Sequence, residues 1–162
     1  MSRLVVVLPL QPLTVGVGFS LSDWPLHVTV LPTFVVAVDL GAVVAAIAPV
    51  LAPQPALRER VGYDEGFGRS GKIPVSVLVP SRALSDLHAR LVAALADIGA
   101  VFDDPEFIGK GYRAHVTKTR VAESFPGDVL TLSQAAIVDM EPEGNGRLRR
   151  VVWAIQLTGG IG

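Results

Sequence analysis

The stretch Leu26-His27-Val28-Thr29-Val30-Leu31 alternates between two sets of side chains, and its central tripeptide recurs as His115-Val116-Thr117. Alternation with a period of two is typical of a β-strand, in which successive side chains point to opposite faces. The histidine, the threonine and Leu31 are therefore expected on one face, and the other three residues on an apolar face that belongs to the core. Each copy of the tripeptide would then present an imidazole and a hydroxyl side by side.

The repeated tripeptide divides the chain into two similar halves. Two of the three histidines in the sequence open it, and the copies lie 88 residues apart. Each half is expected to contain one helix and several strands, and no linker-like stretch separates the halves. We therefore predict an α+β fold for residues 1–162, as a single domain made of two pseudo-symmetric lobes that face each other.

Capping residues and apolar spacing predict two helices. One begins after Asp39 and carries apolar side chains at helical spacing up to Leu51, and the other begins after Ser81 and ends at Gly99. A glycine-rich loop is expected over 65–72, and a hairpin turn over 144–146. The segments expected to be extended are 4–8, 13–19, 26–31, 57–64, 73–79, 112–120, 129–140 and 147–157.

The composition excludes several classes of protein. Half of the residues are apolar and the net charge is -1, so the chain lacks the basic field of many nucleic-acid-binding proteins, and any RNA contact must be local. The absence of cysteine excludes disulfides, thiolate metal sites and a cysteine nucleophile, and agrees with a cytoplasmic protein. Asp39, Gly41 and Pro49 interrupt the apolar run 34–51, which we interpret as a core helix and not as a membrane span.

Two imidazoles that face one phosphate can carry out general acid–base catalysis. The unperturbed pKa of histidine is about 6.5, so one ring can accept the proton of the attacking oxygen while the other gives a proton to the leaving oxygen. Each such transfer typically contributes ~10²–10⁴-fold to the rate. The hydroxyls of Thr29 and Thr117 can donate hydrogen bonds to the non-bridging oxygens. His27 and His115 are therefore the candidate general acid and general base, with no metal or other cofactor.

Other motifs are interpreted as structural. The run Gly66-Phe67-Gly68-Arg69-Ser70-Gly71 has the spacing of a dinucleotide-binding loop, but a strand follows it instead of the required helix. His88 lies within the second predicted helix and has no threonine two residues later. The carboxylates of 103–106 are expected in a solvated turn, and the usual metal-ligand spacings do not occur. Trp24 is expected either in the core or at the mouth of a site, stacked on a base.

In these motifs the chain resembles the two-histidine (2H) phosphoesterase superfamily, in particular its 2′-5′ RNA ligase-like or cyclic phosphodiesterase branch. The family motif is a histidine, an apolar residue, a threonine or serine and a second apolar residue. It stands here as His27-Val28-Thr29-Val30 and His115-Val116-Thr117-Lys118. Tyr112, three residues before the second histidine, and Arg120, five residues after it, also resemble the family pattern.

The resemblance implies two antiparallel β-sheets that line a central cleft, with the helices outside and both motifs in the cleft. Tyr112, Arg113 and Arg120 are candidate substrate contacts, Arg113 because its strand parity matches that of His115. Two residues depart from the family pattern: Lys118 stands where an apolar residue is usual, and Ala114 where a proline is common. By strand parity Lys118 points away from His115, so we do not assign it to catalysis.

We therefore expect a monomeric, metal-independent phosphoesterase that acts on 2′,3′-cyclic phosphate or 2′-5′ phosphodiester bonds, with an RNA end or a small cyclic nucleotide as substrate and no membrane partner. Two alternatives stay open. The protein would bind RNA ends or nucleotides without turnover, or it would join RNA ends as a 2′-5′ ligase. The sequence does not set which histidine is the acid, or the regiochemistry of ring opening.

Overall fold

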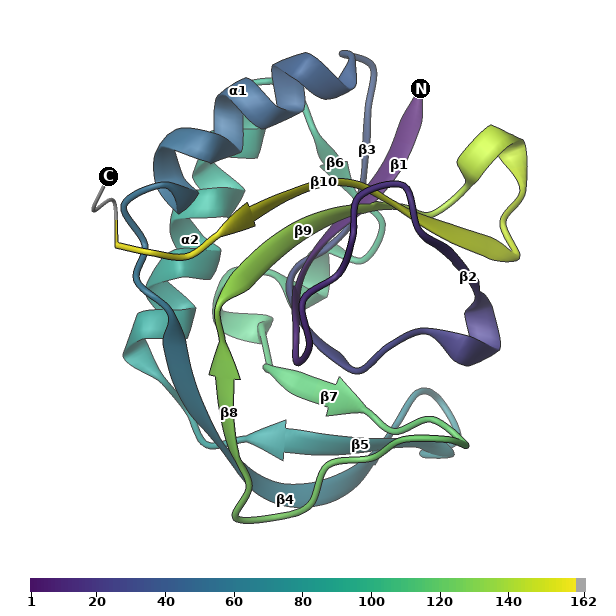
Figure 1. The fold of residues 1–162 in the computed structure, drawn as a ribbon, viewed down its shortest axis with the longest axis vertical. Coiled ribbons are helices and arrows are strands. Elements are labelled where there is room, and N and C mark those ends of the chain that lie inside the picture. The colour runs from purple at the N-terminus through teal and green to yellow at the C-terminus, as the bar shows by residue number, and fades with distance from the viewer. Residues whose placement is uncertain (160–162) are drawn as a thin grey trace.

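The strands of the chain form one strongly curled antiparallel sheet (Figure 1). The structure is a computed structural model and describes residues 1–159. Along the sheet the strands follow the order β2-β10-β9-β1-β3-β7-β5-β4-β8, and β6 pairs with β3 off this path. The bounds are β1 Ser2–Pro9, β2 Gly18–Ser20, β3 His27–Val36, β4 Leu57–Phe67, β5 Ile73–Leu78, β6 Val101–Phe102, β7 His115–Thr117, β8 Val129–Leu132, β9 Gln134–Asp139 and β10 Leu148–Gln156.

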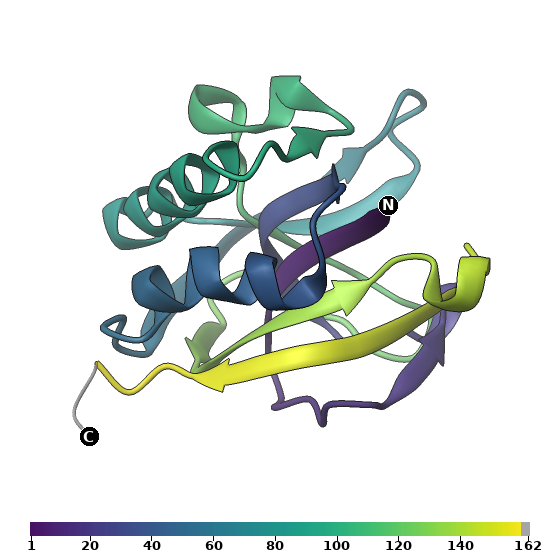
Figure 2. The ribbon, with the colours of Figure 1, turned by 90° about the horizontal axis from the view of Figure 1, so that it is seen from above.

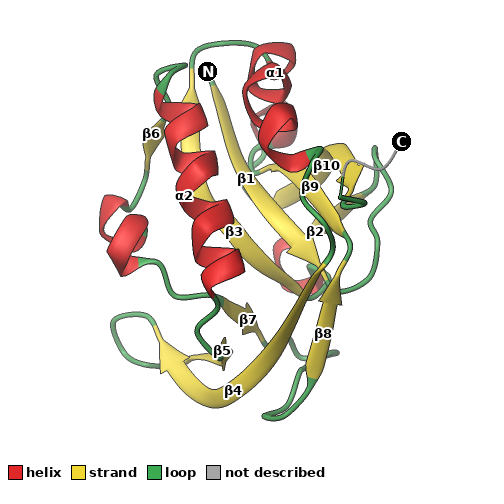
Figure 3. Cartoon of the chain, turned by 90° about the vertical axis from the view of Figure 1, so that its left-hand side faces the viewer, coloured by secondary structure: helices red, strands yellow, loops and turns green. Residues whose placement is uncertain are grey.

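Two helices, α1 (Leu40–Leu51) and α2 (Arg82–Ala96), pack against the same face of the sheet (Figure 3). They lie next to each other and are in contact (Figure 2). The predicted caps are confirmed, because Asp39 accepts a hydrogen bond from the Ala42 N–H at 2.9 Å and Ser81 accepts one from the Leu84 N–H at 3.2 Å. No helix within residues 1–159 is long and apolar enough to cross a membrane.

The side chains of β1 alternate between two hydrophobic clusters. The larger cluster contains Leu4, Val6 and Leu8 and includes the apolar side chains of both helices. The smaller cluster lies on the other face of the sheet and consists of Val5, Val7, Ala136, Val138 and Val151, with partly buried neighbours that include Phe19 and Trp24. Burial on both faces explains why residues 4–8 form an uninterrupted apolar run.

The predicted α+β class is confirmed, and the two sheets expected from the resemblance are joined by one strand pair. β3 and β7, which carry the two motifs, pair with each other in antiparallel orientation. On the β3 side the sheet continues through β1, β9 and β10, and on the β7 side through β5, β4 and β8. The C-terminal strand β9 therefore lies beside the N-terminal strand β1, with β10 on the far side of β9, and the motif strands meet in the middle of one sheet.

One expectation for the first motif strand is wrong. The alternation predicts Leu31 on the same face as His27, but Leu31 is fully buried in the helix-side cluster. The pairing with β1 shifts between Thr29 and Leu31, which is typical of a β-bulge. The bulge resets the alternation, so Val30 and Leu31 are both buried although they are adjacent in sequence.

Several predicted segments have different bounds. Of residues 13–19 only the last two are extended, in the short β2, which continues to Ser20. Residues 112–120 contribute only β7, and 129–140 form the two strands β8 and β9. The hairpin predicted between the last two strands is confirmed, because β9 and β10 pair in antiparallel orientation, but its loop runs over 140–147 and contains a 3-10 turn at Pro142–Gly144, with Glu143 at φ 56°. The 3-10 helices are η1 Leu21–Asp23, η2 Pro105–Phe107, η3 Gly109–Gly111 and η4 Pro142–Gly144.

Candidate active site

The pairing of β3 with β7 brings the two tripeptides together. Val28 lies opposite Val116, so by the antiparallel register His27 lies opposite Thr117 and Thr29 opposite His115. Residues that flank a paired position point to the other face, and the two valines are buried in the helix-side cluster. The four motif side chains therefore share the opposite face, which we call the motif face.

The register also sets the spacing on the motif face. Side chains directly opposite each other on antiparallel strands have Cβ atoms about 4.5–5.5 Å apart, and diagonal neighbours lie at roughly 7–8 Å. His27 and His115 are such a diagonal pair, and each has a threonine opposite it. At this spacing, two imidazoles and two hydroxyls on one face can contact a single tetrahedral anion.

Both motif histidines use the same ring nitrogen to hold their orientation. Nδ1 of His27 lies 2.8 Å from the Pro25 carbonyl oxygen, and Nδ1 of His115 lies 2.8 Å from the Arg113 carbonyl oxygen. A carbonyl oxygen can only accept, so Nδ1 carries the hydrogen in both rings. Within residues 1–159 no protein group bonds to Nε2 of either ring, which leaves that nitrogen available for proton transfer.

Burial lowers the pKa of both motif histidines. Removal from water lowers the pKa of His27 to about 4, against the effect of the hydrogen bond to Pro25 and with the charge of His115 as a smaller contribution. Burial also lowers the pKa of His115, where the hydrogen bond to Arg113 opposes the shift and the charge of Arg113 adds to it. Both imidazoles are therefore neutral at pH 7 and can accept a proton.

Each motif histidine packs against one aromatic ring. The Trp24 ring stacks on His27, with ring centroids 4.3 Å apart and planes 27° apart. The Phe67 ring meets His115 edge to face, with centroids 4.6 Å apart. Of the two positions that the sequence allows Trp24, the structure shows packing against the smaller hydrophobic cluster, and stacking on a base stays a prediction.

The motif face extends from β7 across β5 to β4. Val77 of β5 lies opposite His115 and also opposite Tyr63 of β4, and the same register carries Glu65 and Phe67 to this face. The sequence predicts a loop at residues 65–67, but they are the end of β4. Strand parity would have placed Tyr63, Glu65 and Phe67 on one face had the strand been predicted to its full length.

The glycine-rich run is a β-hairpin tip between β4 and β5 and not a dinucleotide-binding loop. A Cβ on Gly66 would lie 1.9 Å from the Gly71 carbonyl oxygen, so only glycine fits there. Gly68 and Gly71 have φ values of +85° and +66°, which L side chains rarely adopt. The spacing of these glycines is therefore a consequence of the conformation of the hairpin turn.

Of the three predicted substrate contacts, Tyr112 lies deepest. Its hydroxyl donates a 2.7 Å hydrogen bond to the Thr29 carbonyl oxygen, and its ring stacks on His88 with centroids 4.0 Å apart. Burial raises the pKa of this phenol well above its usual value. Tyr112 thus ties the segment before β7 to the first motif strand.

The two arginines are engaged with carboxylates. Arg113 forms an ion pair with Glu65 at 2.8 Å, and Arg120 forms one with Asp23 at 3.4 Å. The Ser20 hydroxyl and Arg120 both hold the pKa of Asp23 below its usual range. Asp23 directly precedes Trp24, so Arg120 links the segment after the second motif to the segment before the first. A substrate role for either arginine stays a prediction.

Lys118, which stands where the family usually has an apolar residue, has a structural role. Its side chain is only 13% exposed and pairs with Asp64 at 3.1 Å and Glu123 at 3.4 Å. Its ammonium group also lies 5.4 Å from the Phe125 ring centroid. The lysine therefore fastens the loop after β7 to β4, on the opposite side of the strand from the motif face.

The remaining predicted features are structural in this fold. His88 is buried, with both ring nitrogens bonded to backbone groups. Asp103 forms an ion pair with Arg3. No three side chains of histidine, aspartate or glutamate within residues 1–159 are grouped so that they could hold a metal ion.

Comparisons with known proteins identify the family and the fold. The family model of the 2′-5′ RNA ligase superfamily matches residues 18–141. Among solved structures, TT0787 of Thermus thermophilus is 15% identical with a TM-score of 0.62, over 99% of this chain and 100% of that chain. E. coli LigT in complex with 3′-AMP is 18% identical with a TM-score of 0.56, over 97% of this chain and 98% of that chain. No curated protein matches the sequence.

Proposed function

Since this chain belongs to the 2′-5′ RNA ligase superfamily, we propose that it hydrolyses 2′,3′-cyclic phosphate or 2′-5′ phosphodiester bonds without a metal ion. The observation that carries the proposal is the pairing of Val28 with Val116, which sets two histidines and two threonines on one face. The members of the fold with bound ligands lend further support, since E. coli LigT is known in complexes with 3′-AMP, ATP and NADP+.

The hydrolytic step uses one imidazole as base and the other, protonated, as acid. Nε2 of the base takes a proton from water as the water oxygen bonds to phosphorus. The P–O bond to the 2′ or 3′ oxygen breaks, and Nε2–H of the acid protonates that leaving oxygen. Thr29 and Thr117 donate hydrogen bonds to the non-bridging oxygens, where negative charge grows. The two Nε2 atoms hold one proton between them before and after the step, so proton exchange with water restores the enzyme.

The direct test is the reaction of the purified protein with a 2′,3′-cyclic mononucleotide and with an oligonucleotide that ends in a 2′,3′-cyclic phosphate. We expect the products to be a nucleoside monophosphate and an oligonucleotide with a monophosphate end, formed at a rate that EDTA leaves unchanged. Phosphorus NMR measures the formation of both products. A ligand that is retained unchanged would favour the binding module, and a joined 2′-5′ product would favour the ligase. A rate that EDTA abolishes and a metal restores would contradict the metal-free step.

The pH profile of kcat/KM is a second expected result. In the active form one of the two Nε2 atoms carries a proton, and kcat/KM follows the ionisation of the free enzyme. The pKa of His27 is about 4 and that of His115 lies below 6.5. We therefore expect a bell-shaped profile with its maximum between these values and a fall of about tenfold per pH unit on the alkaline side. A maximum at or above pH 7 would contradict this assignment.

A further inference from the structure

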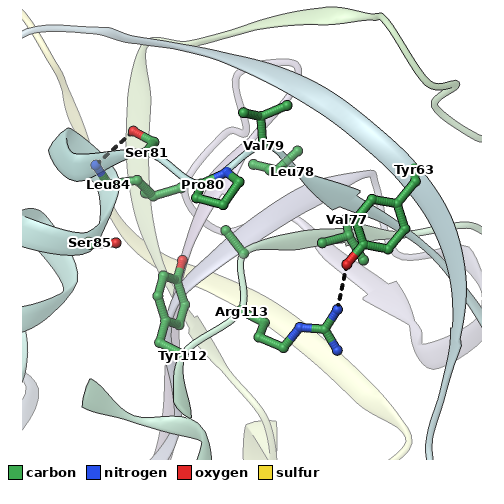
Figure 4. Close-up of a pocket in the computed structure, with 11 residues that line it drawn as sticks. Tyr63, Val77, Leu78, Val79, Pro80, Ser81, Leu84, Ser85, Tyr112 and Arg113 are labelled. Atoms are coloured by element: carbon green, nitrogen blue, oxygen red, sulfur yellow. Dashed lines mark hydrogen bonds between the residues drawn. The ribbon is translucent and has the colours of Figure 1, made fainter. Parts of the chain in front are cut away.

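The side chain of Arg113 is fastened to β4. Its Nη1 donates a hydrogen bond to Oε2 of Glu65 at 2.8 Å, and its Nη2 donates to Oε1 of Glu65 at 3.1 Å. The same Nη2 donates a hydrogen bond of 3.0 Å to the Tyr63 hydroxyl oxygen. Figure 4 marks this bond with a dashed line. A bidentate arginine–carboxylate pair is strong and directional, so the guanidinium has a defined place on this face of β4.

Two independent contacts lead from Arg113 to His115. The backbone carbonyl of Arg113 accepts the hydrogen bond from Nδ1 of His115 at 2.8 Å. The guanidinium lies 5.0 Å from the centroid of the Phe67 ring, which in turn meets the His115 ring at 4.6 Å. Arg113 therefore contacts the ring that packs on His115 and supplies the atom that sets its orientation.

We propose that Arg113 is a positioning residue for His115 and not a substrate contact. Glu65 and Tyr63 hold the guanidinium of Arg113, and the guanidinium holds the Phe67 ring against the imidazole of His115. The Arg113 carbonyl then stays within hydrogen-bond distance of Nδ1 of His115, which keeps Nε2 of that ring directed at the phosphate. This role rests on the proposed function of His115 in proton transfer. It revises the expectation from strand parity alone, in which Arg113 would reach the phosphate.

Replacement of Glu65 distinguishes the two roles of Arg113, because each role predicts a different kinetic effect. If Arg113 bound the substrate phosphate, Glu65 would compete for the guanidinium, and Glu65→Gln would lower KM. If Arg113 positions His115, Glu65→Gln loosens the support and lowers kcat while KM stays unchanged. A misplacement of about 1 Å in a reacting group can cost ~10²-fold in rate, so a partial loss of support should cost roughly tenfold in kcat.

The experiment measures kcat and KM of Glu65→Gln, Arg113→Gln, Arg113→Lys and the double variant Glu65→Gln/Arg113→Gln with a 2′,3′-cyclic mononucleotide. We expect kcat to fall roughly tenfold in each glutamine variant, with little further loss in the double variant because the pair acts as a unit. Arg113→Lys should recover part of kcat, since it keeps the charge but not the bidentate geometry. Glu143→Gln removes a carboxylate that pairs with Arg150 far along the sheet and serves as the matched control.

The ionisation of His115 gives a second readout that needs no turnover. Burial is the main cause of the lowered pKa of His115, and the charge of Arg113 lowers this pKa further. Arg113→Gln should therefore raise the pKa of His115, whereas Glu65→Gln should leave it unchanged or lower it further. Histidine ring signals in NMR, assigned with His115→Ala, follow this titration. Unchanged His115 ionisation in Arg113→Gln, or a raised KM with unchanged kcat, would overturn the positioning role. A wild-type protein without turnover would overturn the proposed function, and the NMR titration would still show whether the charge of Arg113 acts on His115.

Discussion

Replacement of His27 or His115 by alanine is expected to lower kcat for a 2′,3′-cyclic mononucleotide by ~10²–10⁴-fold, since each removes one proton transfer. The two rings lie diagonally across the β3–β7 pair, and each keeps Nε2 free by using Nδ1 to bond a carbonyl. Neither replacement removes a residue of the two hydrophobic clusters. The loss should therefore appear in kcat, with a folded protein and a KM near the wild-type value.

The double variant His27→Ala/His115→Ala tests whether the rings act as one unit. Because acid and base serve the same step, the double variant should lose little more activity than the worse single variant. Unfolding in urea, monitored by circular dichroism, checks that the proteins being compared are folded. A single variant that kept its rate within a factor of about three would contradict the acid–base mechanism, because such a transfer contributes at least ~10²-fold.

The motif could be predicted from the sequence because its geometry is local. In a strand, residues two apart share a face whatever the rest of the fold does, so the prediction that His27 and Thr29 lie together is correct. The pairing of Val28 with Val116 depends on tertiary structure, and the sequence indicates only that the two strands face each other. The bulge that buries Leu31 is likewise set by the partner strand β1.

The support around His115 could not be predicted because it depends on where β4 ends. The glycines from Gly66 onward indicate a turn, and the sequence therefore predicts one loop over residues 65–72. The turn itself begins only after Phe67, so Glu65 and Phe67 belong to a strand and share a face with Tyr63. The turn preference of these glycines predicts the turn. The residues directly before the turn are extended because they form hydrogen bonds with β5, which the local sequence does not indicate.

The third histidine has a different role, which its contacts show. Nδ1 of His88 donates a 2.7 Å hydrogen bond to the Val30 carbonyl oxygen, and the Gly109 N–H donates a 2.9 Å bond to its Nε2. The side chain is 1% exposed, and its ring stacks parallel to Tyr112. Burial lowers the pKa of this ring as well, so it stays neutral and can keep one donor and one acceptor. His88 therefore connects α2 to β3 and to the loop before β7.

His88→Ala is expected to destabilise the fold without removing a reacting group. It leaves the Val30 carbonyl and the Gly109 N–H without their partner, at about 1–3 kcal/mol for each buried polar group, and it opens a cavity under Tyr112. We expect a loss of about 3 kcal/mol or more in the free energy of unfolding, and thus a Tm lower by roughly 6–12 °C. Protein that remains folded should keep a kcat within a few-fold of wild type, unlike His27→Ala. A stability change below about 1 kcal/mol would show that water or a local shift satisfies both backbone groups.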